Sequence, residues 1–584
     1  MFAKQAKIRN KKMIIAILLV VTITFSVLLM PIKAQTDEEG NYFFSIHMMT
    51  FRGRPESEKT VIVLKEEFAK IGIEVTYDTI DGTVWNDRGF KTALELATHE
   101  TGGYDLHLGQ YGLGSPRDPD SFGLTMSSEG RWPGGWNWWL WSNADVDDLY
   151  DAGRVLLERD ERQAIYSQIQ EITVDVVAPV IPIVFMKISR MMSSDLEGYN
   201  PVIGTNQGTS QWILDGQSGG TFRYGGTRDP VSLLPWWGNI GADNFARDIY
   251  ESLVNFDENK NVVPELAKSW EYSEDGLTYT FHLNEGVTWH DGVPFTADDV
   301  VFTYEGILDK TSGTTMWSRV HQNIASIEKV DDHTVTFHLN DRNAGVFSTV
   351  FFPVYIIPKH IMEDVPLADW KHSDQATSSP IGTGPYKFIE WVPEQYITLE
   401  AYDDYYIAGE PNFDERISII LPDAATALAA LQNGDIDYLS NTGYTVDQLA
   451  LVTDDPNIKV INELRDRSLL LGVNLAHPIL NNMFVRKAMS SAIPREKIAN
   501  EVLEGLAIPA TSIWNELHWW WDSTLELPGY DIDQAKAYME MAGYNFEHLE
   551  PDPTTPISQN LVYAVIGLIA GLAIGFVGSR YLKS

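Results

Sequence analysis

The sequence predicts an α/β fold, in which a soluble body of two or three lobes carries a hydrophobic segment at each end of the chain. Strand and helix patterns alternate over residues 42–110, which is typical of α/β proteins. From residue 277 onward, apolar and polar residues alternate in further strands. The 584 residues and the hydrophobic content of 44% suit a globular body with a large core.

The chain is strongly acidic and contains no cysteine. Its net charge of -38 repels nucleic acid and anionic lipid headgroups, so we expect no nucleic-acid partner. The same charge mildly favours cationic or neutral ligands. The absence of cysteine excludes disulfides, thiolate zinc sites, a cysteine nucleophile and a cysteine-linked lipid anchor.

Both ends of the chain carry segments that suit a membrane. Residues 1–12 contain five basic residues and no acid, and residues 13–32 are free of charge, so residues 1–34 are either a signal peptide or a signal anchor. Residues 557–579 are also free of charge and long enough to span a bilayer. Acids precede this run and bases follow it, which places the C-terminus in the cytoplasm. We therefore expect N- and C-terminal transmembrane helices and a body on the extracellular side of the cell membrane.

The front of the body predicts a strand, a helix and two further strands. Residues 44–49 form a strand, and apolar residues at helical spacing follow up to a stop at Gly72. Residues 73–78 alternate as a second strand. Residues 104–108 form a third strand, which runs into a glycine-rich loop at residues 109–114.

The following section predicts a long helical region and then a buried strand. Residues 144–177 are largely helical, with one apolar stripe made of Ile165, Ile169, Ile172 and Val176. Prolines end this helix, and residues 181–185 form a buried strand. Residues 201–219 are rich in Gly, Ser, Thr, Asn and Gln and form a connection.

The rest of the body predicts more strands and two helices. Residues 277–283 and 335–339 alternate as strands. Residues 424–431 form a helix, and Asp533 caps another helix, which ends at Gly543.

A series of short motifs in fixed order begins at residue 220. The motifs are Gly220-Thr-Phe-Arg-Tyr-Gly225, Pro264-Glu-Leu-Ala-Lys-Ser-Trp270, Trp289-His-Asp-Gly-Val-Pro-Phe295, Ile381-Gly-Thr-Gly-Pro-Tyr386 and Leu431-Gln-Asn-Gly-Asp-Ile-Asp437. Together they resemble the family of extracellular solute-binding proteins that serve oligopeptide, dipeptide and nickel ABC importers. The likeness covers about 300 residues, and its strength lies in the number and order of the motifs.

The resemblance also implies a circular permutation. In that family the chain normally continues past the helix that corresponds to residues 533–543, and the missing part looks like the front of this chain. Residues 65–75, 118–122 and 145–149 carry that likeness. The new termini would lie together in one lobe, where permutation is tolerated. The competing view is that the chain joins two fragments of neighbouring paralogues.

The resemblance implies a periplasmic-binding-protein-like fold of the class II type, with two lobes joined by a hinge and an extra subdomain. On this reading residues 42–175 form the C-terminal part of lobe III, and residues 466–548 form its first part. Residues 176–216 return to lobe I and form a connection. The remaining segments are lobe I at 217–258 and 376–465, and the small lobe II at 259–375.

The resemblance places a ligand-facing loop at residues 111–122. In peptide-binding members a Trp opens this loop and a following Asp pairs with the ligand's amino group. Here Tyr111 takes the Trp place, and the Asp place falls on Ser115, or on Gly114 if Arg117 is an insertion. Neither residue supplies a carboxylate to a buried ammonium, which weakens the assignment to free dipeptides. Longer peptides remain, whose amine would find Asp118 or Asp120, as do neutral sugars. The alternative role of both aspartates is turn and cap chemistry.

Tryptophan is abundant, with 18 residues in the chain, and ten of them gather in three groups. Indole faces suit sugar rings, peptide side chains and cations, and packing in the core is the alternative for each. The candidates for the site are Trp132, Trp136, Trp236 and Trp237; a third group spans residues 519–521.

The resemblance implies a binding protein that captures peptides or oligosaccharides for ABC permease and ATPase subunits, and not an enzyme. No Gly-rich phosphate loop is present, so ATP hydrolysis would belong to a separate subunit. We expect no cofactor and no metal site, although nickel-type binding through histidines and carboxylates stays open. The rival functions are a carbohydrate-active enzyme, which also uses a Trp-rich acidic cleft, and a surface ligand sensor.

Overall fold

The computed structural model describes residues 41–112, 117–131, 136–175, 179–202, 208–234, 236–237, 245–439 and 446–549. Both predicted membrane segments, residues 13–32 and 557–579, lie outside this set. Within it, no helix combines the length and the apolar character that crossing a membrane requires.

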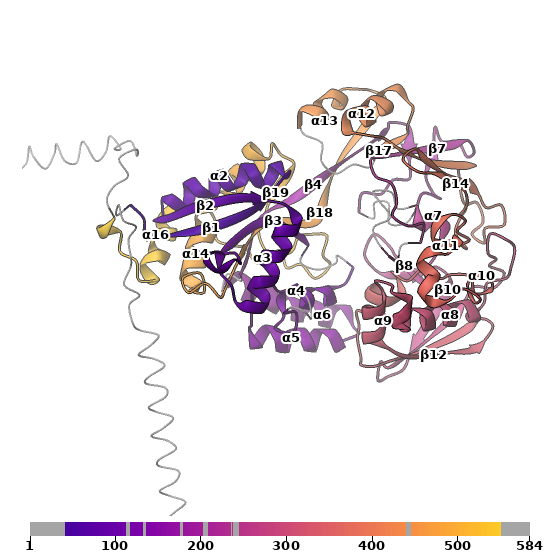
Figure 1. Ribbon diagram of the computed structural model, residues 1–584. Coiled ribbons are helices and arrows are strands. Elements are labelled where there is room, and N and C mark those ends of the chain that lie inside the picture. The colour runs from indigo at the N-terminus through magenta and orange to yellow at the C-terminus, as the bar shows by residue number, and fades with distance from the viewer. Residues whose placement is uncertain are drawn as a thin grey trace, which may run out of the picture.

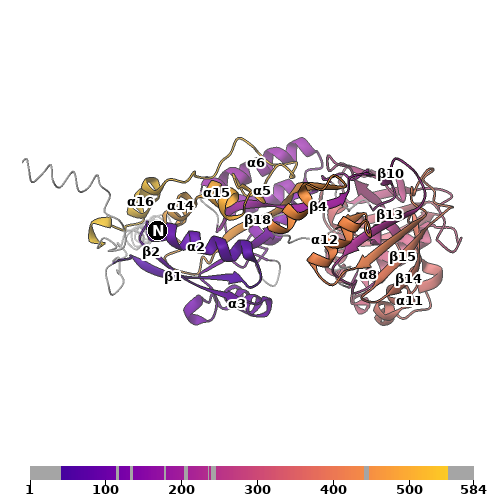
Figure 2. The ribbon, with the colours of Figure 1, turned by 90° about the horizontal axis from the view of Figure 1, so that it is seen from above.

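One large mixed sheet runs through the whole molecule and confirms the α/β fold class. Its strands lie in the order β14-β15-β16-β7-β17-β4-β18-β3-β1-β2, and β19 (Ala507–Pro509) also pairs with β4. The two longest strands, β4 (Val180–Ser193) and β18 (Ile458–Val473), pair antiparallel at the centre. Figures 1 and 2 show that this pair passes from one body of the protein to the other.

One of these bodies contains the described residues of segments 42–175 and 466–548, and we use the predicted name lobe III for it. In it β1 (Phe44–Phe51) pairs in parallel with β2 (Ile73–Ile80) and β3 (Leu106–Gly112), and β3 pairs with β18. Its helices are α2 (Pro55–Ala69), α3 (Gly82–Glu95), α4 (Gly123–Met126), α5 (Ala144–Val155), α6 (Arg159–Asp175), α14 (Met483–Ser491), α15 (Arg495–Lys497) and α16 (Ile532–Met541).

Residues from the front and the back of the chain share one apolar core in lobe III. Ile46 and Phe68 come from the front third, and Val485 and Met539 come from the last quarter. Burying apolar surface that neither segment could cover alone is the main force that holds them together. The front third and the last quarter of the chain therefore pack together into one body.

The second body contains lobes I and II. Lobe I supplies β7 (Thr221–Gly226), β14 (Tyr386–Val392), β15 (Tyr396–Ala401), β16 (Glu415–Ile420) and β17 (Tyr438–Leu439) to the large sheet. Lobe II holds a separate antiparallel sheet of β10 (Ala267–Tyr272), β11 (Thr278–Leu283), β13 (Thr334–Leu339) and β12 (Ile324–Asp331). One apolar core unites the two lobes.

The second body carries several further elements. Its helices are α7 (Ala246–Ile249), α8 (Ala297–Leu308), α9 (Trp317–Asn323), α10 (Lys359–Met362), α11 (Asp374–Thr377), α12 (Ala424–Asn433) and α13 (Val446–Thr453). Short paired strands complete it: β5 (Leu196–Glu197) with β6 (Ile213–Leu214), and β8 (Val254–Phe256) with β9 (Val262–Pro264).

Residues 144–175, the described part of the region expected to be helical, are largely helical and form two helices, α5 and α6, which are separated by residues 156–158. Two details differ from the expectation. The buried face of α6 is not the apolar stripe alone, because Arg162 and Tyr166 are buried with Ile169. Asp531, and not Asp533, caps α16: its side chain accepts a hydrogen bond from the backbone N–H of Gln534, which leaves Asp533 inside the first turn.

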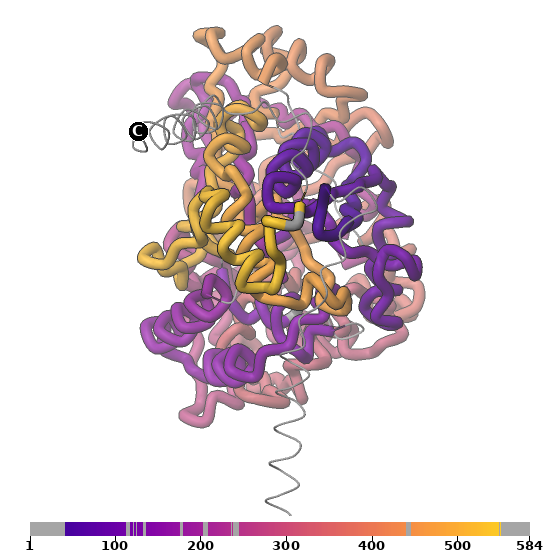
Figure 3. The backbone as a smooth tube through the Cα atoms, turned by 90° about the vertical axis from the view of Figure 1, so that its left-hand side faces the viewer, coloured from indigo at the N-terminus to yellow at the C-terminus, as the bar shows by residue number. Residues whose placement is uncertain are grey.

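The two ends of the described chain lie together. The ring of Phe43 lies 5.1 Å from that of Tyr544 and 4.9 Å from that of Phe546. Figures 1 and 3 both show the first and the last segments, in indigo and yellow, side by side. The chain therefore enters and leaves the body at one place on lobe III.

We expect Gly72→Ala to destabilise this junction more than an equivalent change elsewhere. Gly72 has a φ of +78°, and a Cβ there would lie 2.4 Å from Cδ2 of Phe43. Gly53→Ala is the matched control, because Gly53 has a φ of +74° and open space around it. Urea denaturation of the full chain should show a loss of unfolding free energy about 2 kcal/mol larger for Gly72→Ala. Equal losses would mean that Phe43 does not pack at this position.

Candidate functional site

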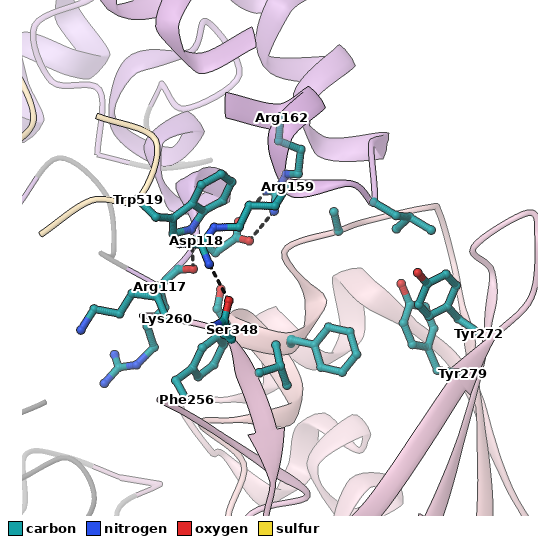
Figure 4. A pocket seen from close by; sticks show the side chains of 15 residues that line it. Arg117, Asp118, Arg159, Arg162, Phe256, Lys260, Tyr272, Tyr279, Ser348 and Trp519 are labelled. Atoms are coloured by element: carbon teal, nitrogen blue, oxygen red, sulfur yellow. Dashed lines mark hydrogen bonds and ion pairs between the residues drawn. The ribbon is translucent and has the colours of Figure 1, made fainter. Parts of the chain in front are cut away.

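A cavity of about 220 Å³ lies where lobe III faces the second body. We call it the interlobe pocket, and Figure 4 shows its lining. Lobe III contributes Arg117, Asp118, Leu157, Arg159, Arg162 and Trp519, and the opposite wall is made of Phe256, Lys260, Asn261, Val262, Tyr272, Tyr279, Ala344, Phe347 and Ser348.

A buried ion pair supports the lobe III wall. Arg162 of α6 binds Asp118 with both terminal nitrogens of its guanidinium group. Nη1 donates to Oδ2 at 2.7 Å, and Nη2 donates to Oδ1 at 2.8 Å. Oδ1 of Asp118 also accepts from the backbone N–H of Asp120 at 2.9 Å and so caps the turn Pro119–Phe122. Asp118 therefore lines the pocket, but its charge is balanced by Arg162.

Trp519 forms an aromatic wall beside this pair. The guanidinium carbons of Arg159 and Arg162 lie over its ring at 4.7 and 5.6 Å, within the range of cation–π attraction. Its Nε1 donates to the backbone carbonyl of Arg117 at 3.1 Å. The indole thus ties the loop at residue 117 to helix α6.

The two walls touch directly at one side of the pocket. Arg159 donates from Nη1 to Oδ1 of Asn261 at 2.6 Å and from Nη2 to the carbonyl of Asn259 at 2.9 Å. The backbone N–H of Ala344 donates to the carbonyl of Arg154 at 2.8 Å. Gly345 packs so closely against lobe III that a Cβ there would lie 2.6 Å from Cβ of Asp120.

The charge of the pocket opposes the charge of the chain. Four lining residues are cationic and Asp118 is the lining acid. Burial and the nearby Arg247 guanidinium lower the pKa of Arg117 to about 10. Burial and the charge of Arg117 lower the pKa of Lys260. The net charge of the whole chain led us to expect cationic or neutral ligands. In a narrow cavity, however, the charged groups nearest to the ligand determine the electrostatic field that acts on it.

Two candidates from the loop, Tyr111 and Asp120, do not line the pocket. The hydroxyl of Tyr111 accepts a hydrogen bond from Nε1 of Trp85 at 3.1 Å. Asp120 pairs with Nε of Arg154 at 2.9 Å and accepts from the hydroxyl of Tyr150. Ser115 and Trp132 lie outside the described residues.

The other tryptophan candidates lie away from the pocket. Trp136 is 53% exposed on lobe III. Trp236 is fully buried in the core shared by lobes I and II, and Trp237 packs against that core. Of the described candidates, only Asp118 is in the lining.

Sequence reasoning missed the pocket's cations and its indole. Trp519 carried a signal, since it belongs to the group at residues 519–521. Arg159 and Lys260 carried no sequence signal that points to a shared site. They are about 100 residues apart in the sequence and come together only through the fold.

A buried network lies behind the pocket. Arg117 and Arg247 both lie over the ring of Phe352, at 4.4 and 4.2 Å. Arg247 binds both carboxylate oxygens of Glu265 at 2.9 Å. Glu251 accepts hydrogen bonds at its Oε1 from two tyrosine hydroxyls, those of Tyr405 and Tyr406.

We expect Glu251 to make stability depend on pH. Burial and the neighbouring Glu265 raise the pKa of Glu251 from 4.5 to about 8. Because the folded state keeps a proton that the unfolded state loses, the free energy of unfolding should fall as pH rises from about 5 to 8. Glu251→Gln, which keeps an acceptor for both tyrosines, should remove this fall and stabilise the protein by about 2 kcal/mol at pH 8.

Denaturation of the full chain at several pH values measures this effect. Glu274→Gln, a change on an exposed residue, is the control and should leave the pH profile unaltered. A Glu251→Gln profile parallel to that of the unchanged protein would show that Glu251 ionises normally.

Comparison with known proteins gives a family match and several relatives. The model of "Bacterial extracellular solute-binding proteins, family 5 Middle" matches residues 261–557. The oligopeptide-binding protein AppA of Bacillus subtilis is 33% identical over 327 residues, which cover 56% of this chain and 59% of AppA. Heme-binding protein A of Haemophilus influenzae is 29% identical over 358 residues, 58% of this chain and 65% of that protein.

Solved structures give a similar extent of overlap. AppA from Bacillus subtilis in complex with a nonapeptide is 30% identical, with a TM-score of 0.47, over 56% of this chain and 65% of that one. HbpA2 from Haemophilus parasuis is 28% identical, with a TM-score of 0.48, over 56% of this chain and 67% of that one. The chain spans 59% and 65% of the two curated relatives described above.

Proposed function

Because the chain belongs to the bacterial extracellular solute-binding proteins of family 5, we propose that it captures oligopeptides in the interlobe pocket and delivers them to the permease of an ABC importer. The observation that carries this proposal is a pocket whose lining comes from two bodies. A solute held there contacts both walls at once, so its binding energy favours the closed arrangement. The family and the relatives above are binding proteins and not enzymes.

Closure would pivot on the two strands that join the bodies. β4 and β18 are continuous across the boundary, but their pairing is irregular between Leu464 and Ser468. A break in the ladder at this point frees backbone groups and lets the strands bend. The proposed movement is a hinge rotation that opens and closes the pocket, as in a class II binding protein.

Peptides are favoured over oligosaccharides. A binding pocket that stacks sugar rings needs an open aromatic face, and two guanidinium groups already lie over Trp519. Peptides instead require mixed apolar and polar walls, which Phe256, Phe347 and Ser348 supply. AppA, the relative with 33% identity, is an oligopeptide-binding protein.

The glycosidase alternative lacks a carboxylate pair in this pocket. Glycoside hydrolysis uses two carboxyl groups on either side of the scissile bond. In the described part of the lining the acid is Asp118, and Arg162 holds both of its oxygens. The second alternative function is a surface sensor that binds the same ligands but does not deliver them to a permease.

We also propose a circularly permuted chain that is anchored at both ends. Residues 42–112 support the permutation because they complete the sheet next to β18. The two ends of the body also touch, at Phe43 and Tyr544. In addition, the relatives align with little more than half of the chain. Segments 13–32 and 557–579 would then leave the body from one place and hold it at the extracellular face of the membrane.

A thermal-shift panel on the full chain in detergent tests the proposed function. Peptides of two to nine residues, oligosaccharides and metal salts are compared, because a ligand that binds only the native state raises the melting temperature. We expect the largest shift with peptides. Trp519→Leu should abolish the shift, whereas Trp136→Leu, a change on an exposed tryptophan of the same lobe, should preserve it. Failure of both peptides and oligosaccharides to shift the melting temperature would overturn the proposal.

A further inference from the structure

Arg159 connects the two bodies directly at one side of the interlobe pocket. It is the first residue of α6 in lobe III, and its guanidinium donates to Oδ1 of Asn261 at 2.6 Å and to the backbone carbonyl of Asn259 at 2.9 Å. Both acceptors belong to the turn between β8 and β9 in the second body. These two bonds exist only while the bodies are close together, so each of them favours closure.

The turn holds both acceptors in place. The carboxylate of Asp257 accepts from the backbone N–H of Asn261 at 2.7 Å and from its Nδ2 at 3.0 Å. Because Nδ2 is directed to Asp257, the amide oxygen of Asn261 is left to accept from Arg159. Two backbone bonds of 3.0 Å, from Asp257 to Asn261 and from Lys260 to Asp257, close the turn. Arg159 therefore meets acceptors that need no rearrangement when the bodies approach each other.

The guanidinium of Arg159 is held in position as well. Its central carbon lies 4.7 Å from the centre of the Trp519 ring, within the range of cation–π attraction. Trp519 is itself fixed, because its Nε1 donates to the backbone carbonyl of Arg117 at 3.1 Å. A planar group that is already oriented loses less freedom when it forms hydrogen bonds. The donor and the acceptors are thus both prepared for the contact.

A second contact supports the first one on the same side of the pocket. The backbone N–H of Ala344 donates to the carbonyl of Arg154, which lies near the end of α5, at 2.8 Å. Figure 1 shows α5 and α6 below the strands β4 and β18, which join the two bodies. Because these contacts lie apart from the joining strands, a rotation that opens the bodies about those strands must break them.

We infer that Arg159 and the turn at residues 257–261 form a latch that closes the two bodies without help from a solute, so that part of the protein is closed before binding. The latch bonds join protein groups to protein groups, and they stabilise the closed arrangement whether or not a solute is bound. The latch thereby determines how far the solute must shift the closing equilibrium. The inference rests on the hinge movement of the proposed function and is independent of which solute binds.

Single-molecule Förster resonance energy transfer on the full chain in detergent tests the latch with no solute added. The chain has no cysteine, so Glu95→Cys on α3 and Glu305→Cys on α8 place one dye on each body. We expect a high-transfer and a low-transfer population, and Arg159→Met should lower the ratio of high to low at least about tenfold. Arg319→Met removes the charge of an exposed arginine on α9, so it is the control and should leave the ratio unchanged.

Asn261→Ala removes the other side of the latch and shows whether the two groups act on each other. Alone it should lower the ratio by no more than Arg159→Met does, because the carbonyl of Asn259 can still accept from Arg159. The double variant should match Arg159→Met, since the bond between the two side chains is already lost. The latch would be overturned by a low-transfer population alone in the unchanged protein, by an unaltered ratio in Arg159→Met, or by a double loss equal to the product of the single losses.

Addition of the best peptide of the thermal-shift panel separates this inference from the proposed function. Saturating peptide should raise the high-transfer population in Arg159→Met again, because the solute supplies closing energy of its own. If the ratio depends on Arg159 but never responds to peptide, the latch stands and the proposed function fails. If peptide raises the ratio while Arg159→Met alone leaves it unaltered, the latch fails and the proposed function stands.

Discussion

Replacing Asp118 by alanine should lower the free energy of unfolding by about 3–5 kcal/mol. The change leaves the guanidinium of Arg162 buried without its counter-ion, and an uncompensated buried charge is one of the most destabilising results of a single substitution. It also removes the cap of the turn Pro119–Phe122. Arg162 would keep the hydrogen bond from its Nε to the neutral carbonyl of Gly153 at 3.1 Å. Its charge would then be balanced only by the weaker attraction of Asp120, which does not hydrogen-bond it.

Chemical denaturation of the full chain measures this loss, and two further variants show its cause. Asp298→Ala breaks an exposed pair with Lys329 and should cost no more than about 1 kcal/mol. The double variant Asp118→Leu with Arg162→Met replaces the pair with apolar groups and should recover most of the stability. A loss for Asp118→Ala as small as that for Asp298→Ala would show that the pair is open to solvent.

The second large effect should fall on ligand binding rather than on folding. Gly345→Leu places a side chain where the second body meets lobe III, because a Cβ there would lie 2.6 Å from Cβ of Asp120 and 2.9 Å from Oδ1 of Asp118. The side chain would hold the bodies apart. We expect solute affinity to fall at least about 100-fold, since the closed state becomes unavailable. The unliganded protein can open, so its unfolding free energy should change by less than about 1 kcal/mol.

Titration with the best peptide of the thermal-shift panel measures this effect. Gly345→Ala should weaken binding to a smaller extent, because its methyl group requires a smaller displacement. Gly529→Leu is the control, since nothing lies within 4 Å of a Cβ at that glycine. Gly345→Leu with unchanged affinity would mean that solute binding does not require this contact.

Local patterns predicted the elements of lobe III well. The period-2 alternation over residues 73–78 and the stop at Gly72 correspond to β2 and to the end of the turn after α2. The strand expected at residues 181–185 is only the first part of β4, which continues to Ser193. The later part crosses into the second body, and its burial there depends on partners that are far away in the sequence. No local pattern carries that information.

The pocket was harder to predict than the fold. The ligand-facing loop led to Asp118, which is in the lining, but the opposite wall comes from segments more than 80 residues away in the sequence. Tryptophan content was ambiguous for a physical reason: the same indole fills a core at Trp236 and forms a pocket wall at Trp519. Composition reports how many aromatic rings a chain has, and only the fold determines which of them face a ligand.

Closure of the two bodies around a solute is the claim on which the account depends most. The chain has no cysteine, so Glu95→Cys on α3 and Glu305→Cys on α8 allow two spin labels to be attached, one on each body. Pulsed dipolar spectroscopy of the labelled full chain then measures the distance between them with and without the best peptide. We expect a broad distribution that becomes narrower and shorter when peptide is added. The same distribution in both conditions, at a peptide concentration that saturates binding, would contradict the account.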